Sequence, residues 1–254
     1  MDISIVIPTY QGTDSLKNVL DALCGQKTGY SYEVICVDSG STDGTRRLCS
    51  AYPVRWFEIK KAEFNHGLTR NFGIGQSRGK YAVLMTQDAV PANDTWLENL
   101  VSKFEDDELI AGIYCRQVPR ENADCVTKKI LNSWITAGKD FRINFIPSRQ
   151  EFDNLNPMQK YVLCYFDNVC SCIRKSVWEK FPFKKTYFGE DVEWGKEIIN
   201  AGYKIAYNPM AAVIHSHKRS IFYEYKRTYL CHRRLYSLFN LQTVPFFKYV
   251  IKCY

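Results

Sequence analysis

Short apolar runs alternate with amphipathic segments through the first hundred residues of the chain. The run Ile3-Ser-Ile-Val-Ile-Pro-Thr-Tyr10 is β-branched and too short for a helix, so it predicts a buried strand. Leucine and valine then recur at spacings of three and four from Leu16 to Leu23, which predicts a helix with Thr13 or Asp14 as its N-cap. Strands and helices alternating in this way indicate βαβ units and a mainly parallel sheet flanked by helices. The further expected strands are 33–38, 54–59 and 81–86, and the further helices are 45–52 and 67–77.

The rest of the chain is less regular. Residues 119–160 are polar and weakly periodic, and we interpret them as a variable insert with some helix. Beyond Ser220 an aromatic and basic stretch is expected to be helical as far as the end of the sequence. No repeat or low-complexity linker divides the chain, so a single domain is expected. Between the insert and the tail, strands are expected at 168–174, 203–207 and 211–214, and a helix at 191–201.

The composition is that of a globular protein, with 46% apolar and 24% charged residues. No run approaches the ~18 uncharged apolar residues of a membrane-spanning helix, and the start lacks the features of a secretory signal, so a cytoplasmic location is expected. No C-x-x-C pair occurs, which excludes a zinc ribbon or a thioredoxin-type motif. Free thiols within apolar patterns are expected to pack as small hydrophobes; they are Cys24, Cys36, Cys49, Cys115 and Cys164.

The formal charge of +7 is concentrated at the end of the chain. Residues 218–254 contain eight basic side chains and one acid, a net of 8 − 1 = +7, so the preceding part is neutral. Three interpretations of this tail stay open. It forms a helix that covers the sheet and turns its basic side to solvent, or it contacts an anionic membrane surface through Phe246, Phe247 and Tyr249. Nucleic-acid binding is disfavoured because the body is neutral and carries no nucleic-acid motif.

Two expected strands are followed by an aspartate. Asp38 ends Val-Ile-Cys-Val-Asp, and Asp88 follows Val-Leu-Met-Thr-Gln. Each alone is explained as a cap of the next turn or helix, but together at one edge of a parallel sheet they favour a binding site. The glycine fingerprint of a dinucleotide site is not met, because Arg78 stands where the last glycine belongs. A diphosphate would then need a cation, and Asp88 offers a hard oxygen ligand to Mg²⁺ or Mn²⁺.

Taken together, seven blocks of sequence, the first of which is the opening strand Ile3–Tyr10, resemble the family 2 inverting glycosyltransferases with the GT-A fold. They occur in the order of that family and extend over residues 3–217. The F-N-H-G, T-Q-D-A and H-S-H variants are most similar to the rhamnosyltransferase branch. The blocks after the opening strand are Val37-Asp-Ser-Gly-Ser-Thr-Asp-Gly44, Phe64-Asn-His-Gly-Leu-Thr-Arg-Asn71, Thr86-Gln-Asp-Ala89, Arg116-Gln-Val-Pro119, Gly189-Glu-Asp191 and His215-Ser-His217.

The resemblance implies a Rossmann-like α/β fold of GT-A type with a C-terminal helical tail. The implied glycosyltransferase domain is 1–217, followed by the basic aromatic tail 218–254. Within the domain, 1–118 would bind the nucleotide sugar, and 119–217 would supply the acceptor and catalytic part.

The resemblance also implies the donor-side roles. Pro8, Tyr10 and Asp38 would bind the base and ribose of the nucleotide, and Arg70 and Gln87 would lie near the donor. The segment Thr86-Gln-Asp88 stands where the family has its D-x-D metal motif, with the first acid replaced. Metal binding would therefore rest on Asp88, with His215 or His217 completing the ligands. Imidazole suits Mn²⁺ better than Mg²⁺, and H-x-H after a strand places both rings on one side of it.

On the catalytic side, Asp191 matches the general base of inverting members. A carboxylate at the start of a helix is stabilised by the helix dipole, and one base is enough to deprotonate an acceptor hydroxyl. Glu190 and Arg116 would lie on the acceptor side. The alternative is that Glu190 and Asp191 are ordinary acids of a first helical turn. His66 is expected to be structural or part of the donor loop.

These implications lead to a metal-dependent enzyme using Mn²⁺ or Mg²⁺. It would move a sugar such as rhamnose from a dTDP-, UDP- or GDP-linked donor to a glycan or lipid-linked glycan during surface polysaccharide synthesis. It would work in the cytoplasm, peripherally at the inner face of a membrane. One alternative is a degenerate module that binds a nucleotide sugar without turnover. The other, a nucleotide-dependent oxidoreductase, conflicts with the failed glycine fingerprint.

Overall fold

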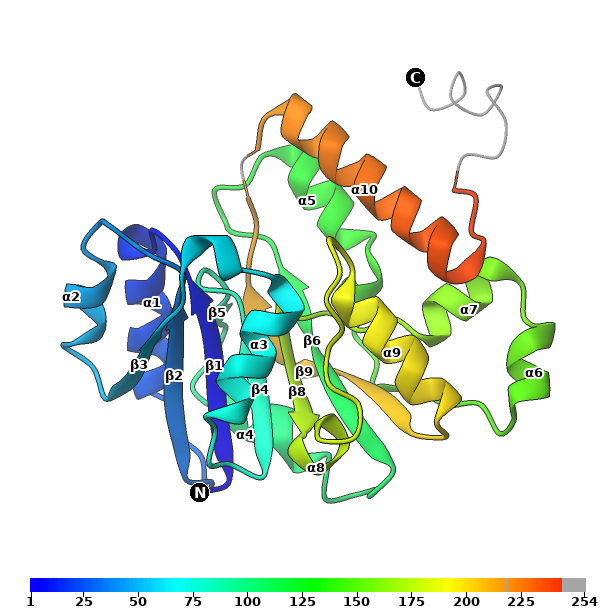
Figure 1. Cartoon of the computed structure of the whole chain (residues 1–254), viewed down its shortest axis with the longest axis horizontal. Helices are drawn as coiled ribbons and strands as arrows, with labels where there is room; N and C mark the ends of the chain where they lie inside the picture. Colours follow the sequence, from blue (N-terminus) through cyan, green and yellow to red (C-terminus); the bar gives the residue numbers. More distant parts are fainter. Residues whose placement is uncertain (218, 244–254) are drawn as a thin grey trace.

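A single nine-stranded sheet forms the centre of the protein, in a computed structural model that describes residues 1–217 and 219–243 (Figure 1). Its order is β3-β2-β1-β4-β8-β6-β9-β5, and β7 pairs with β9 beside this path. Six strands run in one direction, whereas β8 is antiparallel to both of its neighbours. The strands are β1 Ile3–Thr9, β2 Tyr32–Asp38, β3 Val54–Glu58, β4 Tyr81–Met85, β5 Val90–Pro91, β6 Ile110–Val118, β7 Arg142–Asn144, β8 Cys170–Arg174 and β9 Lys204–Ile214.

Helices cover both faces of the sheet and create two apolar cores. The first core packs α1 (Thr13–Cys24), α2 (Thr45–Cys49) and α4 (Trp96–Ser102) on one face. The second packs α3 (His66–Gly75) and α9 (Glu190–Asn200) on the other face. Burying apolar side chains on both faces is typical of a mainly parallel sheet. The second core also receives side chains from α6 Arg149–Asn154, α7 Pro157–Leu163, α8 Lys175–Trp178 and α10 Ile221–Phe239.

The alternation predicted for the first half of the chain is confirmed from β1 to β4, and so are the expected α/β class and mostly parallel sheet. The cap predicted for α1 is wrong, because Gly12 occupies the N-cap position and no side chain caps the helix. The two strands expected at 203–207 and 211–214 form one continuous β9. Between the two expected strands, the register of β9 against β6 shifts: Cys115 pairs with Asn208, but the next residue, Arg116, pairs with Ala212. The skipped residues of β9 include Pro209. Proline cannot donate to the ladder, which favours such an irregularity.

Elements of the middle segment were only partly anticipated. Neither α4 nor β6 was predicted from the sequence, and residues 119–160 were expected only to be an insert with some helix. This segment contains α5 (Cys125–Asn132), α6, the short β7 and the start of α7. β6 and β9 lie side by side near the β5 edge of the sheet, so both expected parts of the chain contribute strands to one sheet. The division at residue 118 stays a prediction about function.

The tail begins as the expected helix. Ser220 caps α10, accepting a hydrogen bond from the backbone nitrogen of Tyr223 at 3.2 Å, and Leu235 and Phe239 are buried in the second core. The three aromatic residues Phe246, Phe247 and Tyr249 lie outside the described residues. Within the residues that are described, no helix is both long and apolar enough to cross a membrane.

Most of the cysteines are buried as expected. Cys36, Cys49, Cys115 and Cys164 lie in the two cores as free thiols. The expectation for Cys24 is wrong, because this residue ends α1 and is exposed.

Candidate active site

One edge of the sheet gathers most of the candidate residues. β1, β2, β4, β6 and β9 all end at this edge, which places Tyr10, Asp38, Asp88, Gln117 and His215 at or near strand ends. Because β8 runs in the opposite direction, its first residues lie at this edge instead of its last ones. Ligands of open α/β sheets bind outside the carboxyl ends of the strands. This edge is therefore the candidate site.

Asp38 organises the loop after β2. It is 2% exposed, and its carboxylate accepts hydrogen bonds from the backbone nitrogens of Gly40 (3.0 Å) and Ser41 (2.7 Å). The hydroxyls of Thr9 (3.1 Å) and Ser41 (2.5 Å) donate to the other oxygen. Pro8 lies in β1 beside Val37 of β2. These bonds join the ends of β1 and β2, so Asp38 holds the shape of the loop that follows β2.

A reciprocal hydrogen bond joins Tyr10 to Gln87. The backbone nitrogen of Tyr10 donates to Oε1 of Gln87 at 2.9 Å, and Nε2 of Gln87 donates to the Tyr10 carbonyl at 3.0 Å. The exposed Tyr10 ring lies beneath Nζ of Lys61, which also donates to its hydroxyl at 2.6 Å. Gln87 thus binds the neighbouring backbone, and its amide holds the loop after β1 against the loop after β4.

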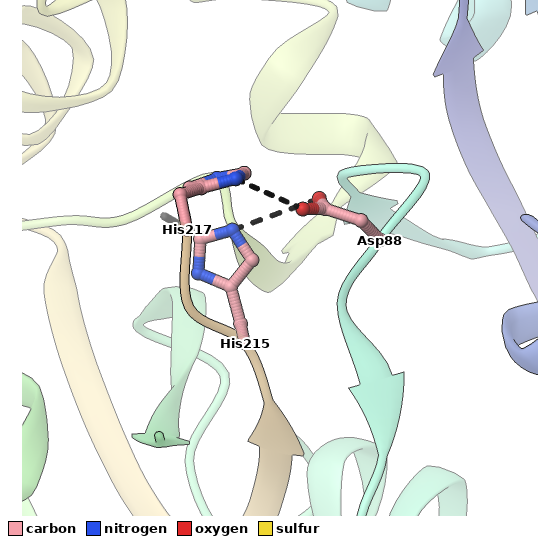
Figure 2. A group of neighbouring side chains, drawn as sticks. All are labelled: Asp88, His215 and His217. Atoms are coloured by element: carbon pink, nitrogen blue, oxygen red, sulfur yellow. Dashed lines mark ion pairs between the residues drawn. The ribbon is translucent and has the colours of Figure 1, made fainter. Parts of the chain in front are cut away.

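Asp88, His215 and His217 form a compact cluster (Figure 2). Nε2 of His215 lies 3.6 Å from Oδ1 of Asp88, and Nδ1 of His217 lies 3.4 Å from Oδ2. Arg120 donates to the Asp88 carbonyl at 2.8 Å and lies 3.9 Å from its carboxylate. The two rings come from the end of β9 and converge on a carboxylate from the loop after β4.

The cluster has the chemistry of a divalent cation site. Its ligand atoms all lie within 4.8 Å of one another, and two atoms bound to one ion at ~2.1 Å are separated by about 3 Å when adjacent and about 4 Å when opposite. Burial lowers the pKa of His215 to about 4 and also lowers the pKa of His217, although Asp88 opposes both shifts. Both rings are therefore neutral at pH 7, as metal ligation requires. One carboxylate with two imidazoles suits Mn²⁺ better than Mg²⁺.

Thr86 occupies the position of the first aspartate of the D-x-D metal motif that Thr86-Gln-Asp88 resembles. Its hydroxyl oxygen is buried and has no hydrogen-bond partner among the described residues. A threonine offers a neutral oxygen where the family motif offers a carboxylate. Asp88 is therefore the single acid of Thr86-Gln-Asp88, and the two histidines are the neighbouring side chains that could supply further ligand atoms.

Asp191 lies in the first turn of α9, after Gly189, which adopts the left-handed conformation with φ 68°. Its Oδ1 accepts from the backbone nitrogen of Val192 at 2.8 Å, and its Oδ2 lies 3.4 Å from the backbone nitrogen of Asn168. Burial, followed by the charges of Glu190 and Asp167, raises the pKa of Asp191 to about 8. A carboxyl group with a raised pKa at a sheet edge has the character of a general base.

Arg70 and Glu190 form a buried ion pair with Nη1 and Oε1 2.8 Å apart and side chains 4% and 8% exposed. Arg70 also donates to the carbonyls of His66 and Asn168, each at 3.1 Å. The pair connects α3 to α9 directly beside Asp191. Arg70, expected near the donor, and Glu190, expected on the acceptor side, thus bind each other. Arg116, which was also expected on the acceptor side, lies in β6 and is partly exposed.

Two residues of the site were not identified from the sequence. Asp167 precedes β8, and Gln117 lies in β6 beside Arg116. Nε2 of Gln117 donates to Oδ2 of Asp167 at 2.7 Å, and the hydroxyl of Tyr165 donates to the same oxygen at 3.0 Å. The block Arg116-Gln-Val-Pro119 contained the signal for Gln117, whereas Asp167 lies in no recognised block.

Comparison with known proteins identifies the family. Residues 4–181 match the family described as Glycosyl transferase family 2. This chain belongs to glycosyl transferase family 2. RfbN of Salmonella typhimurium LT2, named an O-antigen chain rhamnosyltransferase, is 33% identical over 232 residues, which cover 89% of this chain and 70% of RfbN. WbaN of Salmonella anatum, also named an O-antigen chain rhamnosyltransferase, is 31% identical over 88% of this chain and 69% of WbaN. The resemblance found in the sequence blocks is confirmed.

Two solved structures share the fold of this family 2 chain. The mannosyltransferase PcManGT of Pyrobaculum calidifontis, in complex with GDP-Man and Mn²⁺, superposes with a TM-score of 0.63 at 18% identity. TarS 1–349 of S. aureus, in complex with UDP-GlcNAc, superposes with a TM-score of 0.62 at 14% identity. The chain covers 59% of each of those structures, and they cover 88% and 87% of it. The GT-A-like fold is thereby confirmed.

Proposed function

We propose that this family 2 chain is an inverting glycosyltransferase. It would transfer a sugar from a nucleotide-diphosphate donor to a glycan or lipid-linked glycan, and the proposed sugar is rhamnose. The observation that carries the proposal is the placement of two kinds of chemistry at one sheet edge. The cluster of Asp88, His215 and His217 has the ligand set of a divalent cation, and Asp191 has the raised pKa of a base. The relation to RfbN and WbaN supports rhamnose and surface polysaccharide synthesis.

On the donor side, we propose that Pro8, Tyr10 and Asp38 form the walls for the base and ribose. The exposed Tyr10 ring is available for stacking, and the bonds of Asp38 hold the loop in shape. Asp88, His215 and His217 would hold Mn²⁺ or Mg²⁺, which when bound neutralises charge on the diphosphate. The bound nucleotide sugars and the Mn²⁺ of the similar structures support this arrangement.

On the acceptor side, we propose that Asp191 takes the proton from the attacking hydroxyl. The hydroxyl oxygen forms the new bond to the anomeric carbon as the bond to the diphosphate oxygen breaks, and the diphosphate leaves with that electron pair. The proton passes to a carboxylate oxygen of Asp191, so charge and atoms balance. The buried pair of Arg70 and Glu190 fixes the start of α9 and thereby the position of this base.

The first experiment is calorimetric titration of the protein with UDP, dTDP, GDP and CMP, each with and without Mn²⁺. Mn²⁺-dependent binding of one nucleoside diphosphate is the expected result, and dTDP is expected for rhamnose. Absence of binding by all four nucleotides, in a sample whose folding is verified by circular dichroism, would overturn the donor-site proposal.

The second experiment replaces Asp191 with Asn. Transfer is expected to fall by at least about 10³-fold because the base is lost, whereas nucleotide binding is expected to stay within a factor of about two. Glu197→Gln is the matched control, since it removes a carboxylate from the same helix at a surface ion pair with Lys184. Wild-type transfer by Asp191→Asn would contradict the assignment.

The alternative proposal is a module that binds a nucleotide sugar without turnover. The replacement of the first acid of the metal motif by Thr86 is the observation that favours it. This alternative predicts donor binding with neither transfer to any glycan acceptor nor slow hydrolysis of the donor. Release of free sugar from the bound donor, measured over hours, would exclude it.

A further inference from the structure

A series of hydrogen bonds joins His215, one of the two histidines of the candidate metal cluster, to the carboxylate of Asp167, which lies outside the cluster. Nδ1 of His215 lies 3.0 Å from Oε1 of Gln117, and Nε2 of Gln117 lies 2.7 Å from Oδ2 of Asp167. The same oxygen is 3.0 Å from the hydroxyl of Tyr165, whose oxygen is 2.9 Å from Nε1 of Trp134. Gln117 and His215 are 8% and 7% exposed, so water has little access to the bond between them.

Trp134, at the end of the series far from His215, determines which group donates and which accepts in each of these hydrogen bonds. The indole nitrogen of Trp134 is a donor only, so the Tyr165 oxygen accepts its proton and turns its own proton to Asp167. Oδ2 of Asp167 is therefore an acceptor, and the side of the Gln117 amide that faces it must be the NH₂ group. The carbonyl oxygen of Gln117 then faces His215 and can only accept.

This direction decides which ring nitrogen of His215 carries the proton. An acceptor at 3.0 Å from Nδ1 places the proton on Nδ1 and leaves the lone pair on Nε2. Nε2 is the atom that lies 3.6 Å from Asp88 within the cluster. In the opposite tautomer Nε2 would carry a proton into the space where the ligand atoms converge.

We propose that Gln117 is a positioning residue that holds His215 in its Nδ1–H tautomer, with Asp167 fixing the orientation of the Gln117 amide. The inference rests on the proposed function for the metal itself, but the tautomer is a property of the metal-free protein. Partners that orient a metal-ligating histidine commonly change metal affinity about 10–100-fold when removed. Gln117 and Asp167 contribute in this way without touching the ion.

The test uses two variants that keep the volume of the side chain. Gln117→Met removes both hydrogen bonds, and Asp167→Asn allows its new NH₂ group to face Gln117 so that the amide turns over. Gln26→Met is the matched control: Gln26 also bonds through both ends of its amide, to Leu97, Ala22 and Asn93, but lies away from the site. The measurements are ¹H–¹⁵N long-range correlation spectra of the histidine rings without metal, and Mn²⁺ titration followed by electron paramagnetic resonance.

In the wild-type protein His215 is expected to show the Nδ1–H pattern. Both variants are expected to shift it toward Nε2–H and to weaken Mn²⁺ binding by about 10–100-fold, with no change in Gln26→Met. An unchanged His215 tautomer in both variants would overturn the inference, as would an Nε2–H pattern in the wild-type protein. If the wild-type protein bound no Mn²⁺, the metal site of the proposed function would fail, and the ring spectra alone would decide the role of Gln117.

Discussion

Asp191 holds its proton more tightly than an ordinary aspartic acid. The removal of its carboxyl group from water is the main cause, and the nearby Glu190 and Asp167 add repulsion; the backbone nitrogen of Val192 and the charge of Arg70 act in the opposite sense. A higher proton affinity makes a stronger base, but it also lowers the fraction that is ionised at neutral pH. The same side chain therefore has consequences for activity and for stability.

The dependence of activity on pH is the first consequence. The base must be ionised, so kcat/KM is expected to rise by about tenfold for each pH unit below the pKa and to level off near pH 8. Initial rates of sugar transfer between pH 5.5 and 9, at fixed Mn²⁺, measure this limb. A profile that is flat across that range would contradict the role of Asp191.

Stability should depend on pH through the same group. The pKa of Asp191 is raised in the folded state, so above pH ~4 the unfolded chain loses this proton first, and stability falls as pH rises toward 8. Asp191→Asn removes this dependence and is expected to stabilise the protein at pH 8 by roughly 1–3 kcal/mol. This gain in the free energy of unfolding should vanish near pH 4. Urea unfolding of the variant, the wild type and Glu197→Gln at both pH values measures it, and an equal gain at both would refute the explanation.

Among the elements, α3 and α9 depend on one another through the buried pair of Arg70 and Glu190. Removing one partner of a buried ion pair leaves the other charge without compensation, which is far more costly than breaking a surface pair. The structure contains both kinds on α9, since Lys184 and Glu197 form a pair with side chains 56% and 30% exposed. The two pairs allow a direct comparison on the same helix.

Arg70→Ala is expected to reduce the free energy of unfolding by about 3–5 kcal/mol. Lys184→Ala should cost less than about 1 kcal/mol. Urea denaturation followed by circular dichroism measures both. Equal effects of the two substitutions would show that the Arg70–Glu190 pair does not fasten the helices.

The strands differ in how well the sequence alone predicts them. β1 and β2 were predicted because their apolar runs are short, β-branched and buried on both faces. β6 was missed, although it is as buried, because Gly112 interrupts its apolar pattern; a Cβ at that position would meet the ring of Phe166 at 2.8 Å. The reversed direction of β8 and the pairing of Gln117 with His215, 98 residues apart, depend on tertiary contacts that no local pattern encodes.

In the whole molecule, α10 packs against the second core and lies at the top of the view in Figure 1. Several of its apolar side chains are exposed to solvent. Phe222, Tyr225 and Tyr229 share one face of the helix and are 70%, 69% and 57% exposed. Lys226 and Arg233 lie on the same face by their helical spacing and are also exposed. Aromatic and basic groups together fit an anionic lipid surface, where rings insert at the headgroup level and cations meet lipid phosphates.

The protein is expected to sediment with vesicles that contain phosphatidylglycerol, and to remain in the supernatant with vesicles of phosphatidylcholine alone. The double variant Lys226→Glu with Arg233→Glu should lose most of this binding. Lys17→Glu with Lys27→Glu, on the opposite part of the molecule, should keep it. Equal sedimentation with both kinds of vesicle would contradict an electrostatic contact.

The antiparallel junction between β4 and β8 sets a rule for building hybrid enzymes. An exchange of residues 119–217 between relatives would attach a new second half through this junction, where Met85 pairs with Cys170, and through the pairings of β6 with β8 and β9. Side chains of a strand alternate between its faces, so a graft that is one residue longer or shorter between Asp167 and Arg174 would turn every side chain of β8 to the wrong face. Hybrids that preserve this count should fold, and their acceptor preference should follow the grafted half.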